Sequence, residues 1–138
     1  METSMEIATL AQRLVEARVI AIVRAKNREK AVERAVELAQ MGYAALEVTT
    51  DSVGFGEGLL PDIAAAWAAA GIMHCLLGVG TVTTLLQLDT AKAGGANFAL
   101  SPVNPCYGGF EAEEGGFSGA CHRRCVPGSR AFCSALLA

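Results

Sequence analysis

Two kinds of hydrophobic pattern alternate along residues 1–103. Short apolar runs rich in β-branched side chains are separated by longer segments in which apolar residues recur every three or four positions. The continuous runs predict strands buried on both faces, and the periodic segments predict amphipathic helices. The expected strands cover residues 18–25, 43–50, 72–78 and 97–101. The expected helices begin near Thr3, run from Asn27 to Gly42, and cover residues 61–70 and 81–93.

Capping residues mark several of these helices. Thr3 and Glu6 form a T-x-x-E capping box at the first helix, and Asn27 is a suitable N-cap for the second. In the helix over residues 81–93 we expect an apolar side that faces the core, made of Leu85, Leu86, Leu88 and Ala91. A leading helix followed by alternating strands and helices predicts an α/β fold with a parallel sheet and right-handed crossovers.

The pattern ends after Val103. Residues 104–138 hold six of the 15 glycines and four of the five cysteines, and no strand or helix period persists there apart from a short turn at residues 130–137. We therefore expect two parts: an α/β domain over residues 1–103 and an irregular, poorly ordered Gly/Cys-rich tail over residues 104–138. Our hypothesis for the tail is a shifted reading frame, an alternative splice or a truncated gene model.

Composition excludes several classes of protein. Hydrophobic residues make up 52% of the 138 residues, which rules out intrinsic disorder. A net charge of −3 leaves no basic surface for a nucleic acid. The N-terminal segment has no basic region followed by an apolar stretch, so we expect a cytoplasmic protein. Residues 63–88 carry no formal charge, but glycines interrupt them, and we expect a buried strand there and no membrane span.

The cysteines favour neither a disulfide framework nor a metal site. Their number is odd, and no secretory signal is expected. Cys75 lies in an apolar run, which predicts a core thiol. The segment Cys121-His122-Arg123-Arg124-Cys125 has metal-binding side chains but lacks the paired C-x2-C spacing of a zinc site. We therefore expect no metal and no other cofactor.

Polar side chains at the carboxyl ends of the expected strands are the candidates for chemistry, because ligands gather there in parallel α/β folds. Glu47 stands out, since its strand is otherwise made of Tyr, Ala, Leu, Val and Thr. A buried carboxylate is costly unless it is paired or used. Two interpretations stay open: an ion pair with a neighbour such as Arg24, or a general acid/base with a raised pKa.

The segment from Gly78 to Thr81 (Gly-Val-Gly-Thr) is expected to form a strand-to-helix turn. Its glycines would let a ligand approach the backbone, and the following helix N-terminus would offer free N–H groups to an anion. Taken alone, these residues favour an ordinary tight turn over a ligand site. The segment is not a full G-x-G-x-x-G fingerprint, and the sequence does not assemble a Ser/His/Asp triad.

Four segments, taken in order, carry a resemblance to a known family: Val19-Ile20-Ala21-Ile22-Val23-Arg24, Leu46-Glu47-Val48-Thr49, Gly78-Val79-Gly80-Thr81-Val82 and Gly94-Gly95-Ala96-Asn97-Phe98-Ala99-Leu100-Ser101-Pro102. Over residues 4–103 the chain resembles the 2-keto-3-deoxy-6-phosphogluconate (KDPG) / 4-hydroxy-2-oxoglutarate (KHG) aldolase family. The resemblance implies parallel (βα) units of a TIM-type (β/α)8 barrel. It also implies a lyase that cleaves 2-keto-3-deoxy sugar acids through a Schiff base on a lysine.

The resemblance assigns roles to single residues. Glu47 matches the glutamate that moves protons during Schiff-base formation and C–C cleavage. Arg24 matches an arginine near the carboxylate end of the substrate in part of the family. Thr81 and Pro102 match residues that line the keto-acid pocket, whereas Asp51 stands where many members carry an arginine.

The nucleophile of the family has no counterpart in this sequence. Its Schiff-base lysine lies on the sixth strand, whereas this chain is expected to have about four strands, and its lysines are Lys26, Lys30 and Lys92. We expect no Schiff base on the chain alone. We also expect two open sheet edges, which favour a homo-oligomer or pairing with a full-length homologue.

Three functional interpretations follow. The first is an aldolase-type lyase whose substrate is a small keto acid. The second is a non-catalytic fragment that binds keto acids or pairs with a full-length subunit. The third is an unrelated small α/β anion-binding domain.

Overall fold

The computed structural model describes residues 2–101, 118–119 and 134–137. Pro102 and the cysteines of the tail therefore lie outside the described residues. In chain order the elements are α1 (Glu2–Ala17), β1 (Ala21–Val23), α2 (Arg28–Gln40), β2 (Ala45–Thr49), η1 (Phe55–Glu57), α3 (Leu59–Ala69), β3 (Leu76–Gly80), α4 (Leu85–Ala93), β4 (Phe98–Ser101), β5 (Ser118–Gly119) and β6 (Ser134–Leu137).

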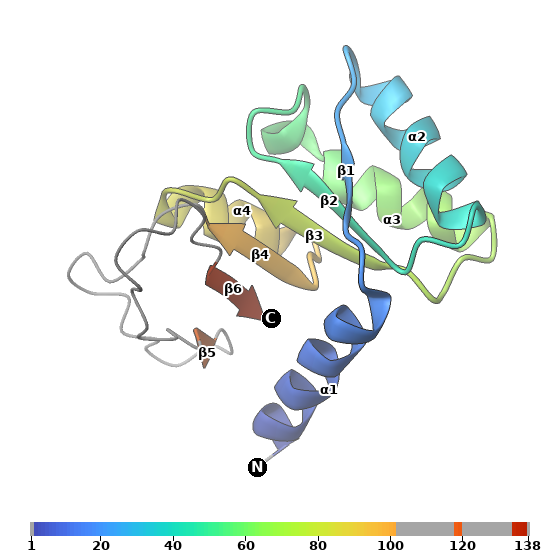
Figure 1. The fold of residues 1–138 in the computed structure, drawn as a ribbon. Helices are drawn as coiled ribbons and strands as arrows, with labels where there is room; N and C mark the ends of the chain where they lie inside the picture. The colour runs from blue at the N-terminus through green and yellow to red at the C-terminus, as the bar shows by residue number, and fades with distance from the viewer. Residues whose placement is uncertain (1, 102–117, 120–133, 138) are drawn as a thin grey trace, which may run out of the picture.

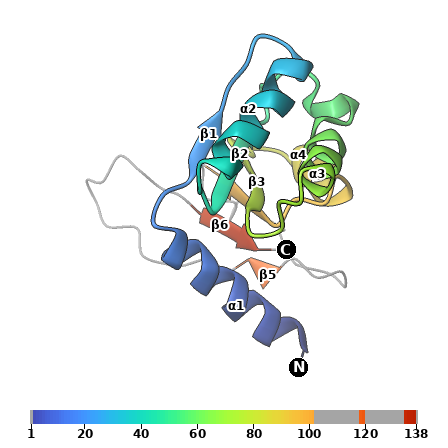
Figure 2. The ribbon, with the colours of Figure 1, turned by 90° about the vertical axis from the view of Figure 1, so that its right-hand side faces the viewer.

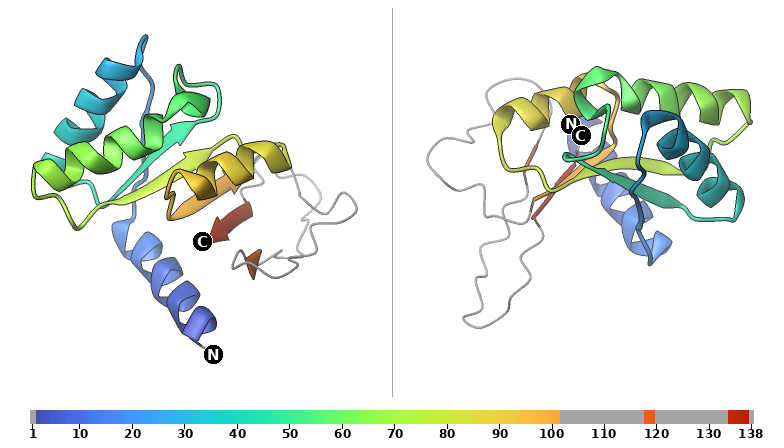
Figure 3. Two further views of the ribbon diagram at one scale, coloured as in Figure 1. Left: turned by 180° about the vertical axis from the view of Figure 1, so that it is seen from behind. Right: turned by 90° about the horizontal axis from the view of Figure 1, so that it is seen from above.

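One sheet organises these elements, with the strand order β1-β2-β3-β4-β6-β5 (Figure 1). Strands β1 to β4 are parallel, and a helix separates each from the next. Helices α2, α3 and α4 lie along one face of the sheet, and α1 lies on the other side (Figure 3). The α/β class is confirmed, and the four parallel units form a truncated TIM-type barrel.

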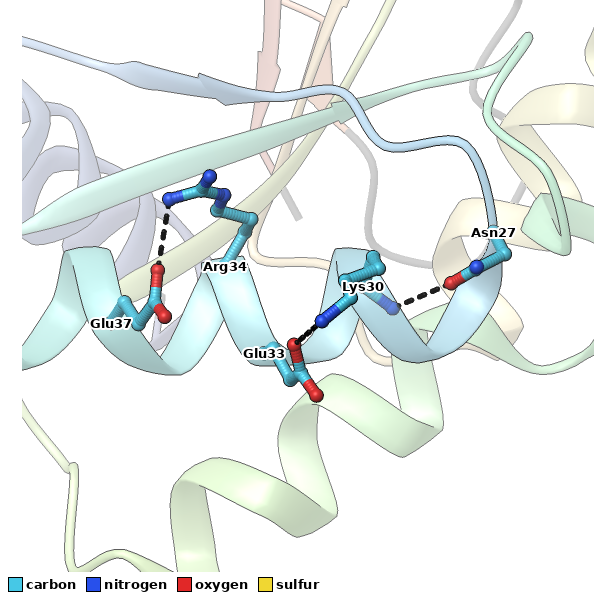
Figure 4. Close-up of polar contacts among 5 residues, drawn as sticks. All are labelled: Asn27, Lys30, Glu33, Arg34 and Glu37. Atoms are coloured by element: carbon cyan, nitrogen blue, oxygen red, sulfur yellow. Dashed lines mark hydrogen bonds and ion pairs between the residues drawn. The ribbon is translucent and has the colours of Figure 1, made fainter.

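Helix α2 shows how the sequence fixes one of these units (Figure 4). The Asn27 side chain accepts a hydrogen bond from the backbone N–H of Lys30 at 2.8 Å, which confirms the expected N-cap. Exposed ion pairs Lys30–Glu33 and Arg34–Glu37 line its outer side. Such exposed pairs contribute little to stability. The stability of the helix in the fold therefore comes from its buried side, which consists of Ala31, Ala35 and Ala39.

The two faces of the sheet pack against different partners. Facing α2–α4, alternate strand residues enter the main core, and these are Leu46, Val48, Leu77 and Val79. The opposite face, which we call the inner face, holds a smaller cluster in which Leu10 of α1 packs with Ala45, Leu76 and Phe98. This cluster lies at the amino ends of the strands, where α1 runs below the sheet (Figure 2). Farther along β2, the same face carries Glu47 and Thr49.

Helix α4 departs from the expectation. It begins at Leu85, because Thr84 forms a capping box with Gln87. Leu88 and Ala91 are buried as expected, but Leu85 and Leu86 are 56% and 75% exposed. The prediction that these two leucines face the core was wrong, since they occupy the exposed first turn of the helix.

Strand β3 and helix α1 also differ from the expected bounds. Strand β3 covers Leu76–Gly80, whereas residues 72–78 were expected. The two glycines at its end therefore continue the strand and form no turn. Helix α1 begins at Glu2, so Thr3 lies inside the helix and is not the N-cap that was expected.

The tail contributes strands where none was expected. Strand β6 pairs antiparallel with β4 over four residues, from Phe98↔Leu137 to Ser101↔Ser134, and β5 pairs with β6. One of the two edges expected to be open is thus occupied, because an antiparallel strand can satisfy the edge N–H and C=O groups without a crossover helix. Strand β1 is the other edge of the sheet. None of the helices in the described part of the chain combines the length and hydrophobicity needed to cross a membrane.

Candidate active site

Glu47 is the one acidic residue buried within the parallel sheet in the described part of the chain. It lies in the middle of β2, opposite Ile22 of β1 and Gly78 of β3, and it is 8% exposed. Its side chain points to the inner face, because the neighbouring residues Leu46 and Val48 point to the helices. The fold thus carries a carboxylate on the inner face of the parallel sheet, against Gly80 at the carboxyl end of β3.

Burial raises the pKa of Glu47, and the attraction of Arg24 offsets part of this rise. Within the described residues, no ion pair joins the two side chains. Arg24 is exposed just beyond the end of β1. Of the two interpretations left open by the sequence, the geometry favours a carboxyl group with a raised pKa over a closed ion pair.

Arg24 also acts on a second carboxylate. The pKa of the exposed Asp51 is lowered, first by a hydrogen bond from the Thr49 side chain and, less strongly, by Arg24. The Thr49 hydroxyl lies 3.2 Å from the hydroxyl of Ser52. Arg24 is therefore within electrostatic reach of both Glu47 and Asp51.

Thr81 follows β3 with a strained backbone. Its φ is +60°, a left-handed conformation that is unusual for a β-branched residue. Two hydrogen bonds from Thr50 hold this turn. Its N–H donates to the Gly80 carbonyl at 3.1 Å, and its hydroxyl donates to the Thr81 carbonyl at 2.9 Å. On the other side, the N–H of Val82 donates to the Leu100 carbonyl at 3.1 Å. Such strain persists where the surroundings over-determine it, which is common at binding sites.

Thr50 supports the turn at Thr81, and the sequence did not single it out. A hydroxyl at the end of a strand gives no indication of its hydrogen-bond partner. Arg24 and Thr81 follow the carboxyl ends of β1 and β3, and Glu47 lies in the middle of β2 between them. Pro102, the fourth expected site residue, lies outside the described residues.

The less favoured interpretation of the Gly78–Thr81 segment, an anion site on a helix N-terminus, finds no helix N-terminus there. Gly78 and Gly80 lie inside β3, and the next helix starts only after Thr84. There the Thr84 hydroxyl accepts the N–H of Gln87 at 3.2 Å. A side chain therefore already uses one of the N–H groups that an anion would need.

The remaining reactive side chains lie outside the parallel strands. Lys26 follows β1, Lys30 lies on α2 and Lys92 on α4, and all three are exposed. Cys75 precedes β3 at the opposite end of the sheet, and burial raises the pKa of its half-buried thiol to about 11, so that it is protonated at neutral pH. Across the described residues, no three His, Cys, Asp or Glu side chains are grouped so that they could hold a metal ion.

The comparison with protein families agrees with this geometry. The sequence model of the KDPG and KHG aldolase family matches residues 10–111, which include all four parallel strands and both Glu47 and Thr81. No curated protein matches the chain significantly. Because the family match covers well over half of the sequence, the chain belongs to the KDPG and KHG aldolase family.

Proposed function

We propose that the chain supplies the proton-transfer and substrate-binding half of an aldolase-type lyase. The substrate class is a 2-keto-3-deoxy sugar acid, with or without a phosphate, which is cleaved to pyruvate and an aldehyde. The observation that carries this proposal is Glu47: a buried carboxyl group with a raised pKa, on the inner face of a barrel-like sheet. A carboxyl group whose pKa is raised holds its proton more tightly than an ordinary glutamate, so it can act as an acid and, once ionised, as a base.

The roles follow from the chemistry of a 2-keto acid. A lysine amine adds to the keto carbon, and Glu47 protonates the carbinolamine hydroxyl, which leaves as water. The resulting carboxylate of Glu47 then takes the proton of the C4 hydroxyl. The C3–C4 electron pair moves into the iminium, and the aldehyde is released. Arg24 attracts the substrate carboxylate, and the exposed Thr81 hydroxyl donates to it.

The lysine is the part that we do not assign to this chain. Lys26, Lys30 and Lys92 are exposed on a loop and on two outer helices, and none lies on a strand of the sheet. We propose that the chain alone forms no Schiff base. The second candidate function follows from the same observation: a cytoplasmic, non-catalytic fragment that binds keto acids or pairs with a full-length subunit or a second copy. Membership of an aldolase family removes the third interpretation, an unrelated anion-binding domain.

Trapping with borohydride tests the missing nucleophile. Pyruvate and sodium borohydride are added to the purified chain and to a full-length family member, and intact masses are compared. We expect an adduct on the full-length protein and none on this chain. An adduct here that disappears in Lys26→Arg, Lys30→Arg or Lys92→Arg would overturn this part of the proposal and identify the nucleophile.

Complementation tests the proton-transfer role. The chain is mixed with the separately expressed C-terminal half of a family aldolase, which carries the lysine, and pyruvate release is followed. We expect activity that Glu47→Gln abolishes, while Lys30→Arg on the outer helix leaves it unchanged. Activity that survives Glu47→Gln would contradict the role of Glu47. If the halves associate without activity, the non-catalytic interpretation is favoured.

A further inference from the structure

Strand β3 contains two glycines, Gly78 and Gly80, whose side-chain positions face the inner face of the sheet. Neither has a positive φ; the described glycines that do are Gly42, Gly54, Gly58, Gly71 and Gly95. The backbone at positions 78 and 80 would therefore accept any L residue. A strand normally gains packing from side chains, so two glycines here require another explanation.

Space supplies that explanation. A Cβ at position 80 would overlap the Glu47 side chain, and its three nearest heavy atoms all belong to that glutamate and lie under 3.0 Å away. A Cβ at position 78 would overlap the ring of Phe98 in the same way. Each glycine thus makes room for one side chain from a neighbouring strand: Gly80 for a group on β2, and Gly78 for a group on β4.

The register shows in which direction Glu47 leans. Glu47 is paired with Gly78, whereas Gly80 is paired with Thr49, two residues farther along β2. The carboxylate nevertheless lies against Gly80, so the side chain leans towards the carboxyl ends of the strands, where Arg24 and Thr81 are. Within the described residues, no hydrogen bond or ion pair fixes this carboxylate. Its location is set by the shape of β3.

We propose that Gly80 is a positioning residue for the proton-transfer group: the space above its Cα seats the Glu47 carboxylate against the backbone of β3. This inference rests on the proposed function for its relevance to catalysis, but its test does not. A side chain at position 80 would push the carboxylate out of its seat, towards solvent and Arg24. Gly78, on the same strand and the same face, has no such role, because its space is filled by an aromatic ring.

A crossed pair of rescues tests the proposal on the intact chain. Gly80→Ala and Gly78→Ala are each made in three backgrounds: unchanged, Glu47→Ala and Phe98→Ala. Urea unfolding midpoints are measured for all of them. We expect Glu47→Ala to abolish the loss caused by Gly80→Ala but not that caused by Gly78→Ala. Phe98→Ala should do the reverse.

The pKa of Glu47 gives a second readout, followed by NMR of the 13C-labelled glutamate carboxyl groups. Gly80→Ala should lower this pKa towards the ordinary glutamate value, because the carboxylate leaves its buried seat. Gly78→Ala should leave it where it is. An equal loss from Gly80→Ala with and without Glu47, or an unchanged Glu47 pKa in Gly80→Ala, would overturn the proposal.

A Gly80→Ala chain that does not fold still gives an answer. Folding of the Glu47→Ala/Gly80→Ala double variant would then support the seat, and failure of both would refute it. The outcome is independent of the lyase assay. If complementation gives no activity but the double variants are rescued, the proposed function alone is refuted. If complementation gives activity but the double variants are not rescued, only the role of Gly80 is refuted.

Discussion

The two faces of the sheet differ in polarity and in packing. The face towards α2–α4 is mainly apolar, and residues such as Leu46 and Val79 are fully buried there. The inner face changes character along the strands, from the cluster around Phe98 under α1 to the carboxylate of Glu47. Ile22 of β1, which is the register partner of Glu47 on β2, is 54% exposed.

This difference separates stability from chemistry within one sheet. Apolar burial on the helix-facing side is the main source of free energy for folding. The inner face instead holds features that cost free energy: a buried carboxyl group, two glycines in a strand and a left-handed threonine. Such features are expected where a protein uses a surface for binding or catalysis.

The helix-facing side should tolerate substitution least. Leu46→Ala removes a fully buried side chain from the main core and should lower the free energy of unfolding by about 2–5 kcal/mol. Urea denaturation followed by circular dichroism measures this. A loss below about 1 kcal/mol would contradict the assignment of this face as the stabilising one.

Glu47→Gln should change how stability depends on pH. The folded chain holds the Glu47 proton more tightly than the unfolded chain, because burial raises its pKa above 4.5. The associated stability is therefore complete below the unfolded pKa and is lost as pH rises through the folded pKa. The loss amounts to about 1.4 kcal/mol for each tenfold difference in proton affinity between the two states. The neutral variant should lack this loss, so its advantage should grow with pH and then level off. A constant difference between the two proteins across this range would refute the raised pKa.

Thr50→Val should cost about 1 kcal/mol, because it leaves the backbone bond to Gly80 intact but removes the hydroxyl bond to the Thr81 carbonyl. Thr50→Ser keeps a donor and serves as the control. In complementation, Thr50→Val should also weaken substrate binding, since Thr81 loses a support. Equal stability of the Val and Ser variants would show that the hydroxyl does not hold the turn.

Ile22→Ser should change stability least, within about 0.5 kcal/mol, since the side chain is already half exposed on an edge strand. Sedimentation and urea unfolding are measured at several protein concentrations. A large, concentration-dependent loss would reveal that a second copy covers the β1 edge in solution.

The order of the elements and the outstanding carboxylate could be predicted from the sequence. Apolar runs located the four parallel strands, and Asn27 marked the start of helix α2, because these signals depend only on neighbouring residues. The reason for glycine at positions 78 and 80 could not be predicted in this way. A glycine that bends a turn and a glycine that makes room for a neighbour look alike until the side chains of Glu47 and Phe98 are placed.

Other differences have the same origin in long-range contacts. The Thr50 hydroxyl bonds a residue 31 positions away, and β6 reaches β4 from the far end of the chain. Leu85 looked like a core residue because its spacing fits a helix period, but the capping box at Thr84 sets where that helix starts. Periodicity predicts faces within an element and does not predict its first turn.

The position of Arg24 has a consequence for binding. Its positive charge opposes the rise in the pKa of Glu47 and helps to lower the pKa of Asp51. An anion that settles on the guanidinium would weaken both attractions at once, and the affinity of Glu47 for a proton would rise. Association of a carboxylic acid with this surface would then take up protons from the solvent. The measured heat of binding would then depend on the ionisation enthalpy of the buffer, because ligand binding and proton uptake would be thermodynamically linked.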